Sequence, residues 1–194
     1  MGRVQSAAEQ NYLKAIYQLQ QETGRATTQA LAVRLGVKPS SVTAMMKHLA
    51  AAPDGPYVTH TPYHGVTLTA RGEGVVLKMA RRHRLLELFL ATQLDVPWDQ
   101  IHAEAERLEH VISDDLAERI AAKLGLPTRD PHGDPIPCRD GTVEAADDVP
   151  LHALEAGAHG TVAHVPDGEP GPLQYLGPPG IVPVATVTVE AVTP

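Results

Sequence analysis

The sequence predicts a mainly α-helical chain with a short β hairpin after its third helix and a small β-rich region at its C-terminal end. Three observations lead to this fold class. Apolar residues recur at helical spacing through most of residues 5–124. Valine, threonine and tyrosine around residues 57–72 follow the pattern of short strands. After residue 150, β-branched residues stand in short runs between glycine and proline clusters.

The N-terminal region begins with two predicted helices. Residues 5–22 have the apolar spacing of an amphipathic helix that ends before Gly24. Thr27 or Thr28 can accept a backbone hydrogen bond as the N-cap of a second helix, and Gly36 can close that helix in a left-handed conformation. Both predicted helices therefore end at a glycine.

A third helix is predicted to follow after a short turn. Pro39 suits the first turn of a helix, where a missing backbone N–H costs nothing. Small and apolar residues stand at Ala32, Gly36, Val42 and Met45. This spacing lets two helices approach closely across a turn, so it indicates a helix-turn-helix. The segment YVTHTPYHGVTLTARG behind it predicts two strands around a Pro-Tyr-His-Gly tip, which would form a wing.

The middle of the chain predicts three more helices. Residues 72–93, rich in valine, leucine and methionine, predict a long one. After the break LDVPWDQ, Asp99 can cap a helix that reaches about residue 112, and Ser113 or Asp114 can start the next, which reaches Leu124. Proline, glycine and aspartate then predict a linker, and the tail predicts a small barrel or sheet. We expect a winged helix-turn-helix at residues 1–73, a helical domain at 74–140, a linker at 141–150 and a β domain at 151–194.

Length and composition fit a globular chain inside the cell. The chain has 194 residues, of which 43% are hydrophobic, enough for a sizeable core. A single cysteine, Cys138, excludes an intrachain disulfide framework and fits a reducing cytoplasm. No run approaches the ~20 apolar residues of a membrane span, and the first ten residues lack the apolar core of a signal peptide. We therefore expect a cytoplasmic protein that does not bind a membrane.

The net charge of −7 is divided unevenly between the two halves of the chain. Residues 1–98 carry +5 and residues 99–194 carry −12. The positive half suits a polyanion and the negative half suits cations, although ordinary solubilising charge explains both equally well. The run Arg81, Arg82 and Arg84 either extends the basic surface or consists of exposed helix charges.

The helix-turn-helix and its wing favour DNA binding over the other use of such three-helix cores, which is to bind proteins. The N-terminal part of the second motif helix enters the major groove, where its side chains meet bases and phosphates. The predicted partner is double-stranded DNA. The candidate contacts are Arg25, Thr27, Lys38, Pro39, Ser40, Ser41, Thr43, Ala44, Lys47, His60, Thr61 and Tyr63.

Two predicted helices carry histidine and glutamate one turn apart, and one of them adds a Glu-His pair. The residues are His83, Glu87, His102, Glu106, Glu109 and His110. The last four fall within an arc of about 100° on a helix. Imidazole nitrogens and carboxylate oxygens without thiolate suit Mn²⁺, Fe²⁺ or Zn²⁺, so these residues predict a metal site, with a structural polar cluster as the alternative. His132 and the later histidines lack this arrangement, and we expect them in loops or at the surface.

With both elements in place, the chain resembles the diphtheria-toxin-repressor family of metal-dependent transcriptional repressors, which has iron and manganese branches. The resemblance covers about residues 5–140 and rests on EQNYLKAIYQL, VKPSSVTAMMKHL, RRHRLLELFL, IHAEAERLEHVISDDL and GDPIP. The family implies a winged helix, a helical domain that binds metal and dimerises, and often an SH3-like third domain. We accordingly expect a homodimer and an SH3-like fold for the tail, which is similar to that domain only in pattern.

The resemblance also implies roles for individual residues. The ancillary metal site of the family corresponds to His83, Glu87 and His102, and in the tail Glu169 is the best match for a further ligand, with Gln174 nearby. The primary site corresponds to Glu106, Glu109 and His110, and its remaining ligand in the first helix corresponds to Asn11.

The ligand types favour manganese. Iron-responding members of the family carry Met in the first helix and Cys where Glu106 stands, whereas manganese-responding members carry Asp and Glu. Asn11 and Glu106 offer oxygen and no sulfur, which favours Mn²⁺ over Fe²⁺, and Zn²⁺, Co²⁺ or Cd²⁺ would substitute in vitro. Lys14 stands where the manganese branch has another carboxylate, so the chain departs from the paired-ion arrangement of that branch.

The resemblance therefore predicts a repressor of manganese or iron homeostasis, with no enzymatic activity, in which the ion orders the dimer for operator binding. Two alternatives belong to other classes. One is a winged-helix regulator that responds to an organic ligand. The other is a metal-dependent hydrolase in which Glu109 acts as general base.

Overall fold

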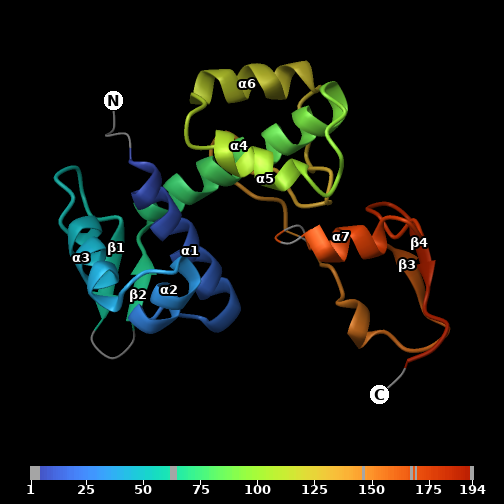
Figure 1. Ribbon diagram of the computed structural model, residues 1–194, viewed down its shortest axis with the longest axis horizontal. Coiled ribbons are helices and arrows are strands. Elements are labelled where there is room, and N and C mark those ends of the chain that lie inside the picture. The colour runs from blue at the N-terminus through green and yellow to red at the C-terminus, as the bar shows by residue number, and fades with distance from the viewer. Residues whose placement is uncertain (1–4, 62–64, 146, 167, 169, 193–194) are drawn as a thin grey trace. The chain divides into compact units, whose positions relative to one another are not determined.

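Figure 1 shows the computed structural model of the chain, which describes residues 5–61, 65–145, 147–166, 168 and 170–192. The chain divides into two compact units, residues 1–79 and 80–194, and the helix α4 (Ala70–Gln93) contributes to both. Each unit has its own hydrophobic core. None of the described helices combines the length and the apolar composition needed to span a membrane.

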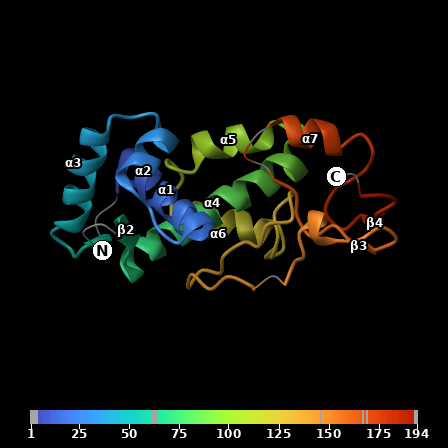
Figure 2. The ribbon, with the colours of Figure 1, turned by 90° about the horizontal axis from the view of Figure 1, so that it is seen from below.

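The N-terminal unit is a three-helix core with a β hairpin, as predicted. Its elements are α1 (Ala7–Thr23), α2 (Thr28–Leu35), α3 (Pro39–Ala50), β1 (Val58–Thr61) and β2 (Gly65–Leu68). The helix α2 packs against both α1 and α3, and α3 contacts β1 (Figures 1 and 2). The helix-turn-helix and the two strands of the wing are thereby confirmed, while the predicted tip at residues 62–64 lies outside the described residues.

Short-range chemistry sets the ends of these helices. Gly24 ends α1 and Gly36 ends α2, both in the left-handed region with φ of 76° and 63°. The hydroxyl of Thr27 accepts a hydrogen bond of 3.1 Å from the backbone N–H of Ala30 and so caps α2. Pro39 opens α3. The helix boundaries of the motif therefore follow from residues within a few positions of each end.

The segment before α2 is attached to the hairpin by backbone hydrogen bonds. Ala26 and Val66 exchange N–H···O bonds of 3.4 and 2.8 Å. Gly65 makes this approach possible, because it has φ of +87° and a Cβ there would lie 2.5 Å from the carbonyl oxygen of Ala26. The core between the helices and the hairpin contains the fully buried residues Leu13, Ile16, Leu31, Val42, Leu49 and Tyr57.

Three helices form the core of the second unit. They are α4, α5 (Ile101–Leu108) and α6 (Asp114–Lys123), with buried Leu85, Leu86, Leu90, Ile101, Ala105, Ala117 and Ile120 between them. Ser113 caps α6 by accepting the backbone N–H of Leu116 at 3.1 Å, as predicted.

Two predicted features of α5 are wrong. Its N-cap is Gln100, and the predicted cap Asp99 instead accepts a hydrogen bond of 2.8 Å from the side-chain amide of Gln174. The helix also ends at Leu108 rather than near residue 112, so Glu109 and His110 stand in the turn that follows. At the start of α5 the carbonyl of Pro97 accepts the backbone N–H groups of Gln100 and Ile101, at 2.8 and 3.2 Å, so a turn precedes the helix.

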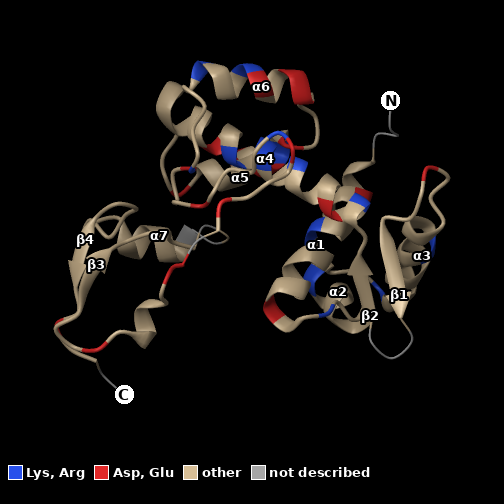
Figure 3. Ribbon diagram, turned by 180° about the vertical axis from the view of Figure 1, so that it is seen from behind, with Lys and Arg blue, Asp and Glu red and all other residues tan. Residues whose placement is uncertain are grey.

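The basic run in α4 is neither an extended DNA-binding surface nor a set of free helix charges. Arg81 forms a bidentate pair with Glu118 at 2.9 and 3.1 Å, Arg82 lies 3.7 Å from Asp114, and Arg84 lies 3.6 Å from Asp134. Figure 3 shows basic residues along α4 and acidic residues at the start of α6. These arginines therefore pair within their own unit.

The tail forms a smaller structure than a complete barrel among the described residues. The strands β3 (His159–Thr161) and β4 (Thr186–Thr188) pair antiparallel, beside the 3₁₀ turn η1 (Leu151–Ala153) and the helix α7 (Pro170–Leu176), which the sequence did not predict (Figure 1). The small sheet is consistent with the expected SH3-like domain, which stays a prediction. The backbone N–H of Val165 donates to the carbonyl of His132 at 2.9 Å, so the tail contacts the loop before it.

Candidate functional site

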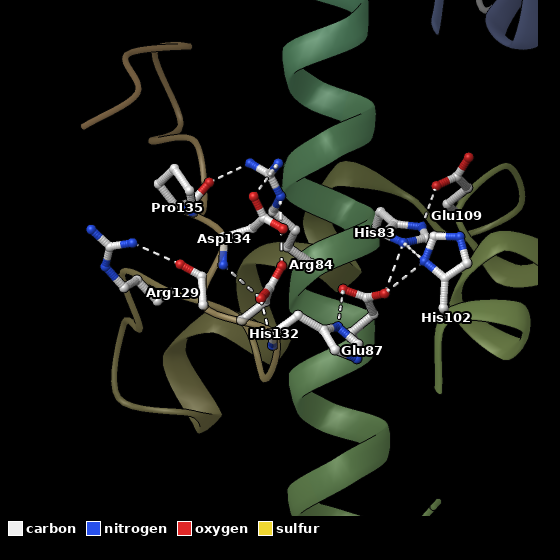
Figure 4. Close-up of polar contacts among 11 residues, drawn as sticks. His83, Arg84, Glu87, His102, Glu109, Arg129, His132, Asp134 and Pro135 are labelled. Atoms are coloured by element: carbon white, nitrogen blue, oxygen red, sulfur yellow. Dashed lines mark hydrogen bonds and ion pairs between the residues drawn. The ribbon is translucent and has the colours of Figure 1, made fainter. Parts of the chain in front are cut away.

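The acid–imidazole residues of α4 and α5 meet in one buried cluster (Figure 4). His83 and Glu87, one turn apart on α4, face His102 on α5. The Nε2 atom of His83 lies 3.0 Å from Oε1 of Glu87 and 3.2 Å from Nδ1 of His102, and Nδ1 of His102 lies 3.1 Å from the same Glu87 oxygen. One donor atom from each of the three residues lies within 4.8 Å of the others, so this group could hold a metal ion.

Glu109 joins this cluster from the turn after α5. It is almost fully buried, and its Oε2 atom lies 2.6 Å from Nδ1 of His83. Its other oxygen lies 3.6 Å from Nε2 of His110. Glu109 therefore links the residues predicted for the ancillary site to His110 of the predicted primary site.

A second group of three donors shares Glu87 with the first. The ligand atoms of Glu87, Asp130 and His132 also lie within 4.8 Å of one another, and all three side chains are buried. The Oε2 atom of Glu87 lies 3.8 Å from Nδ1 of His132 (Figure 4). Glu87 thus directs one carboxylate oxygen to each group.

The loop that carries Asp130 and His132 is held by its own hydrogen bonds and by packing. The Oδ1 atom of Asp130 accepts the backbone N–H groups of His132 and Asp134 at 2.8 and 3.0 Å. The ring of Trp98 stacks on His132 with the centroids 5.5 Å apart. The buried Oδ2 atom of Asp130 lies 3.6 Å from Nε of Arg84, and the buried Oε2 atom of Glu87 lies 3.8 Å from Nδ1 of His132, so both oxygens face nitrogen atoms at more than hydrogen-bond distance. A metal ion in this group would be a second cation beside Arg84 for Asp130.

Burial and hydrogen bonding change the proton affinities of the cluster. Burial alone would lower the pKa of His83, but its hydrogen bonds to Glu109 and Glu87 outweigh burial and raise the pKa to about 9. Burial opposes ionisation of Glu87 as well, yet its pKa is lowered because three histidines face its carboxylate. Burial and the charge of Glu87 raise the pKa of Asp130 to about 7.

None of the contacts given above joins the other predicted metal ligands to this cluster among the described residues. Glu106 is exposed on α5. Asn11 is exposed on α1 of the N-terminal unit. Glu169 lies outside the described residues. The structure thus brings together His83, Glu87, His102, Glu109 and His110.

Asp130 and His132 were missed by the reasoning from sequence, and the expectation of a surface or loop position for His132 was only half right. His132 stands in a loop but is fully buried. The signal available was the pattern Asp-x-His in a segment of otherwise linker-like composition, RDPHGDP. Its burial depends on Trp98 and on Val165, which contact the loop from other parts of the unit.

The predicted DNA-contacting residues are largely exposed in the N-terminal unit. Along α3 these are Lys38, Pro39, Ser40, Ser41, Thr43, Ala44 and Lys47, and elsewhere Arg25, His60 and Thr61. Thr27 is half-buried, with its hydroxyl used in the cap of α2. Tyr63 lies outside the described residues.

Comparison with known proteins identifies both regions. The family described as iron dependent repressor, N-terminal DNA binding domain, matches residues 6–66. The family described as iron dependent repressor, metal binding and dimerisation domain, matches residues 69–138. The resemblance to repressors of the diphtheria-toxin-repressor type is thereby confirmed.

Individual relatives agree with these family matches. The iron-dependent repressor IdeR of Mycobacterium tuberculosis is 34% identical over 195 residues, which cover 92% of this chain and 82% of that protein. The transcriptional regulator MntR of Shouchella clausii is 37% identical over 111 residues, 57% of this chain and 75% of the relative. A solved structure of a manganese-dependent transcriptional repressor in complex with manganese is similar at a TM-score of 0.86 and 42% identity, covering 95% of this chain and 85% of that one.

These relatives are transcriptional regulators and not enzymes, which confirms the expected absence of enzymatic activity and excludes the hydrolase alternative. The DNA-binding model matches the part of this chain with the helix-turn-helix, and the metal-binding model matches the part with most of the donor residues. The chain therefore belongs to the iron-dependent repressor family of metal-dependent, DNA-binding transcriptional repressors.

Proposed function

We propose that this chain is a homodimeric repressor of manganese homeostasis genes, which Mn²⁺ activates for binding to operator DNA. The observation that supports it best is the buried cluster of His83, Glu87 and His102, whose three donor atoms come within 4.8 Å of one another. A bound ion would supply positive charge that these buried donors share. The protein would act in the cytoplasm, where operator DNA lies.

The donor set supports Mn²⁺ ahead of Fe²⁺. The donor atoms of the cluster are carboxylate oxygens and imidazole nitrogens. The single cysteine of the chain, Cys138, is exposed and is not one of its donors. Sites without thiolate suit the harder ions of the first transition series. A solved relative that is 42% identical over most of this chain is a manganese-dependent repressor in complex with manganese.

We assign three sets of residues to the ions. The ancillary set is His83, Glu87 and His102, with Glu169 of the tail as a further ligand. The primary set is Glu106, Glu109 and His110, which Asn11 of the N-terminal unit completes. The third set, Glu87, Asp130 and His132, would offer an additional position that shares a carboxylate with the ancillary set.

In this proposal the primary set couples metal binding to DNA binding, because its ligands come from both units of the chain. Asn11 stands on α1 and Glu109 and His110 stand after α5, so their joint engagement would tether the units. The tether needs only to favour the DNA-binding arrangement over others, and a ten- to hundredfold preference corresponds to about 1.4–2.8 kcal/mol of coupling. Operator DNA would in return tighten metal binding by the same factor.

The test of the function is an operator titration under defined metal conditions. We expect that the Mn²⁺-loaded protein selects a dyad-symmetric sequence from a random DNA pool, and that chelator weakens binding to it about 10- to 100-fold. Fluorescence anisotropy with Mn²⁺, Fe²⁺, Zn²⁺ or chelator measures the effect. Equal binding under all four conditions would point to a regulator of another kind, such as one that responds to an organic ligand.

Metal binding should depend on pH, because two donors hold protons in the metal-free protein. The pKa of His83 is about 9 and that of Asp130 about 7, so at neutral pH a ligating ion displaces protons from both. We expect Mn²⁺ affinity to rise from pH 6 to pH 9, with about one to two protons released at pH 7. Calorimetry in two buffers of different ionisation enthalpy counts these protons, and an affinity that is constant over this range would contradict the assignment.

The same groups set the sign of the pH dependence of stability without metal. The folded-state pKa of His83 lies above its usual value of 6.5, so its stabilising contribution is complete below pH 6.5 and is lost as the pH rises through about 9. The raised pKa of Asp130 acts in the same direction between about pH 4 and 7. Saturating Mn²⁺ should remove this loss of stability at high pH, which thermal unfolding would measure.

A further inference from the structure

One carboxylate in the first turn of α1 contacts both its own helix and the end of the recognition helix α3. The Oε2 atom of Glu9 accepts hydrogen bonds from the backbone N–H and the hydroxyl of Ser6, at 2.8 and 3.0 Å, in a capping box. Its Oε1 atom lies 2.8 Å from Nε2 of His48 in the last turn of α3. Glu9 is only 2% exposed, whereas the side chain of His48 is 53% exposed.

A second set of contacts links the start of α1 to the C-terminal end of α3. Gln5, directly before α1, donates from its side-chain amide to the hydroxyl of Tyr57 at 2.7 Å. The backbone N–H of Tyr57 in turn donates to the carbonyl of Leu49 in the last turn of α3, at 3.0 Å. The start of α1 therefore holds the C-terminal end of α3 both directly and through Tyr57.

Pro53, two residues after the C-cap, stops α3, but no left-handed glycine closes this helix end. Its C-cap is Ala51, with φ of −103° and ψ of 19°, in place of the left-handed glycines that end α1 and α2. The contacts from Glu9 and Tyr57 therefore add to the local signals that position this end. A recognition helix must keep its position to within a fraction of an ångström for its side chains to reach the correct base edges.

We propose that Glu9 and His48 are positioning residues for operator binding, and that their contact transmits the order of the first turn of α1 to the recognition helix. This inference rests on the proposed function, in which Asn11, two residues after Glu9, takes part in metal binding. A single carboxylate forms the cap of α1 and the contact with α3, so a loss of order at the start of α1 also releases the end of α3. Glu9 itself is buried and cannot contact DNA.

A double-mutant cycle in the full-length protein tests the inference. Glu9→Asp keeps a negative charge in the first turn but shortens the side chain by one methylene, so the carboxylate no longer reaches both Ser6 and His48. His48→Ala removes the other partner. We expect each variant to weaken operator binding in saturating Mn²⁺ about tenfold and the double variant to weaken it no further, because both remove the same contact.

Two readouts separate positioning from other roles of these residues. Affinity for scrambled DNA should stay within about twofold, because non-specific binding depends on charge and not on alignment with the bases. Additive effects, about a hundredfold in the double variant, together with weaker scrambled-DNA binding, would mean that His48 contacts phosphate directly and would overturn the inference. The matched control is Glu22→Asp at the other end of α1, where Glu22 pairs with Arg34 of α2 at the surface, and it should change operator affinity less than twofold.

A measurement without DNA tests the structural part of the inference, the link between the start of α1 and the end of α3, independently of the proposed function. Amide hydrogen exchange of residues 47–50 in Glu9→Asp should be at least about tenfold faster than in the unaltered chain, with exchange in β1 and β2 unchanged. Unchanged exchange at the end of α3 would overturn the inference. Absence of Mn²⁺-dependent operator binding in the unaltered chain would instead overturn the proposed function, and the exchange experiment would still stand.

Discussion

Glu109→Gln is expected to lower operator affinity in saturating Mn²⁺ about a hundredfold, to the level seen with chelator. The amide keeps the shape of the side chain but removes the negative charge beside His83, whose Nδ1 lies 2.6 Å from the carboxylate. It also replaces a charged oxygen ligand of the proposed primary set with a weaker, neutral one. Because the whole metal-to-DNA coupling is typically 5–150-fold, a loss of this size means that the coupling is gone.

The number of Mn²⁺ ions bound by the Glu109→Gln protein distinguishes the proposed primary set from the ancillary set. Glu109→Gln leaves His83, Glu87 and His102 in place, so calorimetry should show the loss of one class of bound Mn²⁺ and retention of another. The matched control is Glu104→Gln on α5, whose carboxylate pairs with Arg107 three residues later at the surface. This control should retain both the ion count and the operator affinity. A Glu109→Gln protein that binds all of its ions and its operator normally would refute the role of Glu109 as a ligand.

Val111→Glu is expected to convert the dimer into monomers and to weaken operator binding at least about a hundredfold. Leu108, Val111 and Leu116 expose apolar side chains within nine residues of one another along the chain, and Val111 is 75% exposed. They belong to the segment that matches a metal binding and dimerisation domain. A charge at the centre of such a surface opposes its burial. A monomer loses the second half-site and the high effective concentration that linkage provides.

Sedimentation velocity measures the oligomeric state of this variant, and anisotropy measures its operator affinity. Leu94→Glu is the control, because Leu94 is also exposed, to 58%, but stands just after the end of α4 and away from residues 108–116 in the chain. The control should stay dimeric and bind DNA normally. A Val111→Glu protein that remains a dimer would show that the subunits associate through another surface.

Several helix boundaries and the first donor group could be predicted because their chemistry is local. Thr27, Gly36 and Pro39 stop and start helices through contacts within a few residues, and the structure confirms each of them. The pair His83 and Glu87 shares one helix face by its spacing alone. Asp99 had the same kind of local signal as an N-cap and failed: a turn closed by the carbonyl of Pro97 precedes α5, and the Asp99 carboxylate accepts a hydrogen bond from Gln174, 75 residues later.

The amino-acid sequence was therefore sufficient for the helix-turn-helix, its wing strands, and a cluster of nitrogen and oxygen donors on α4 and α5. Tertiary structure alone decided that Glu87 faces two groups of donors and that Arg84 pairs with the loop following α6. It also decided that Asp130 and His132 come within reach of Glu87. The physical reason is the distance along the chain over which each kind of interaction acts. Helix spacing and caps act over about one turn, whereas the position of this loop depends on the packing of Trp98 and on the backbone contact from Val165, which no local pattern encodes.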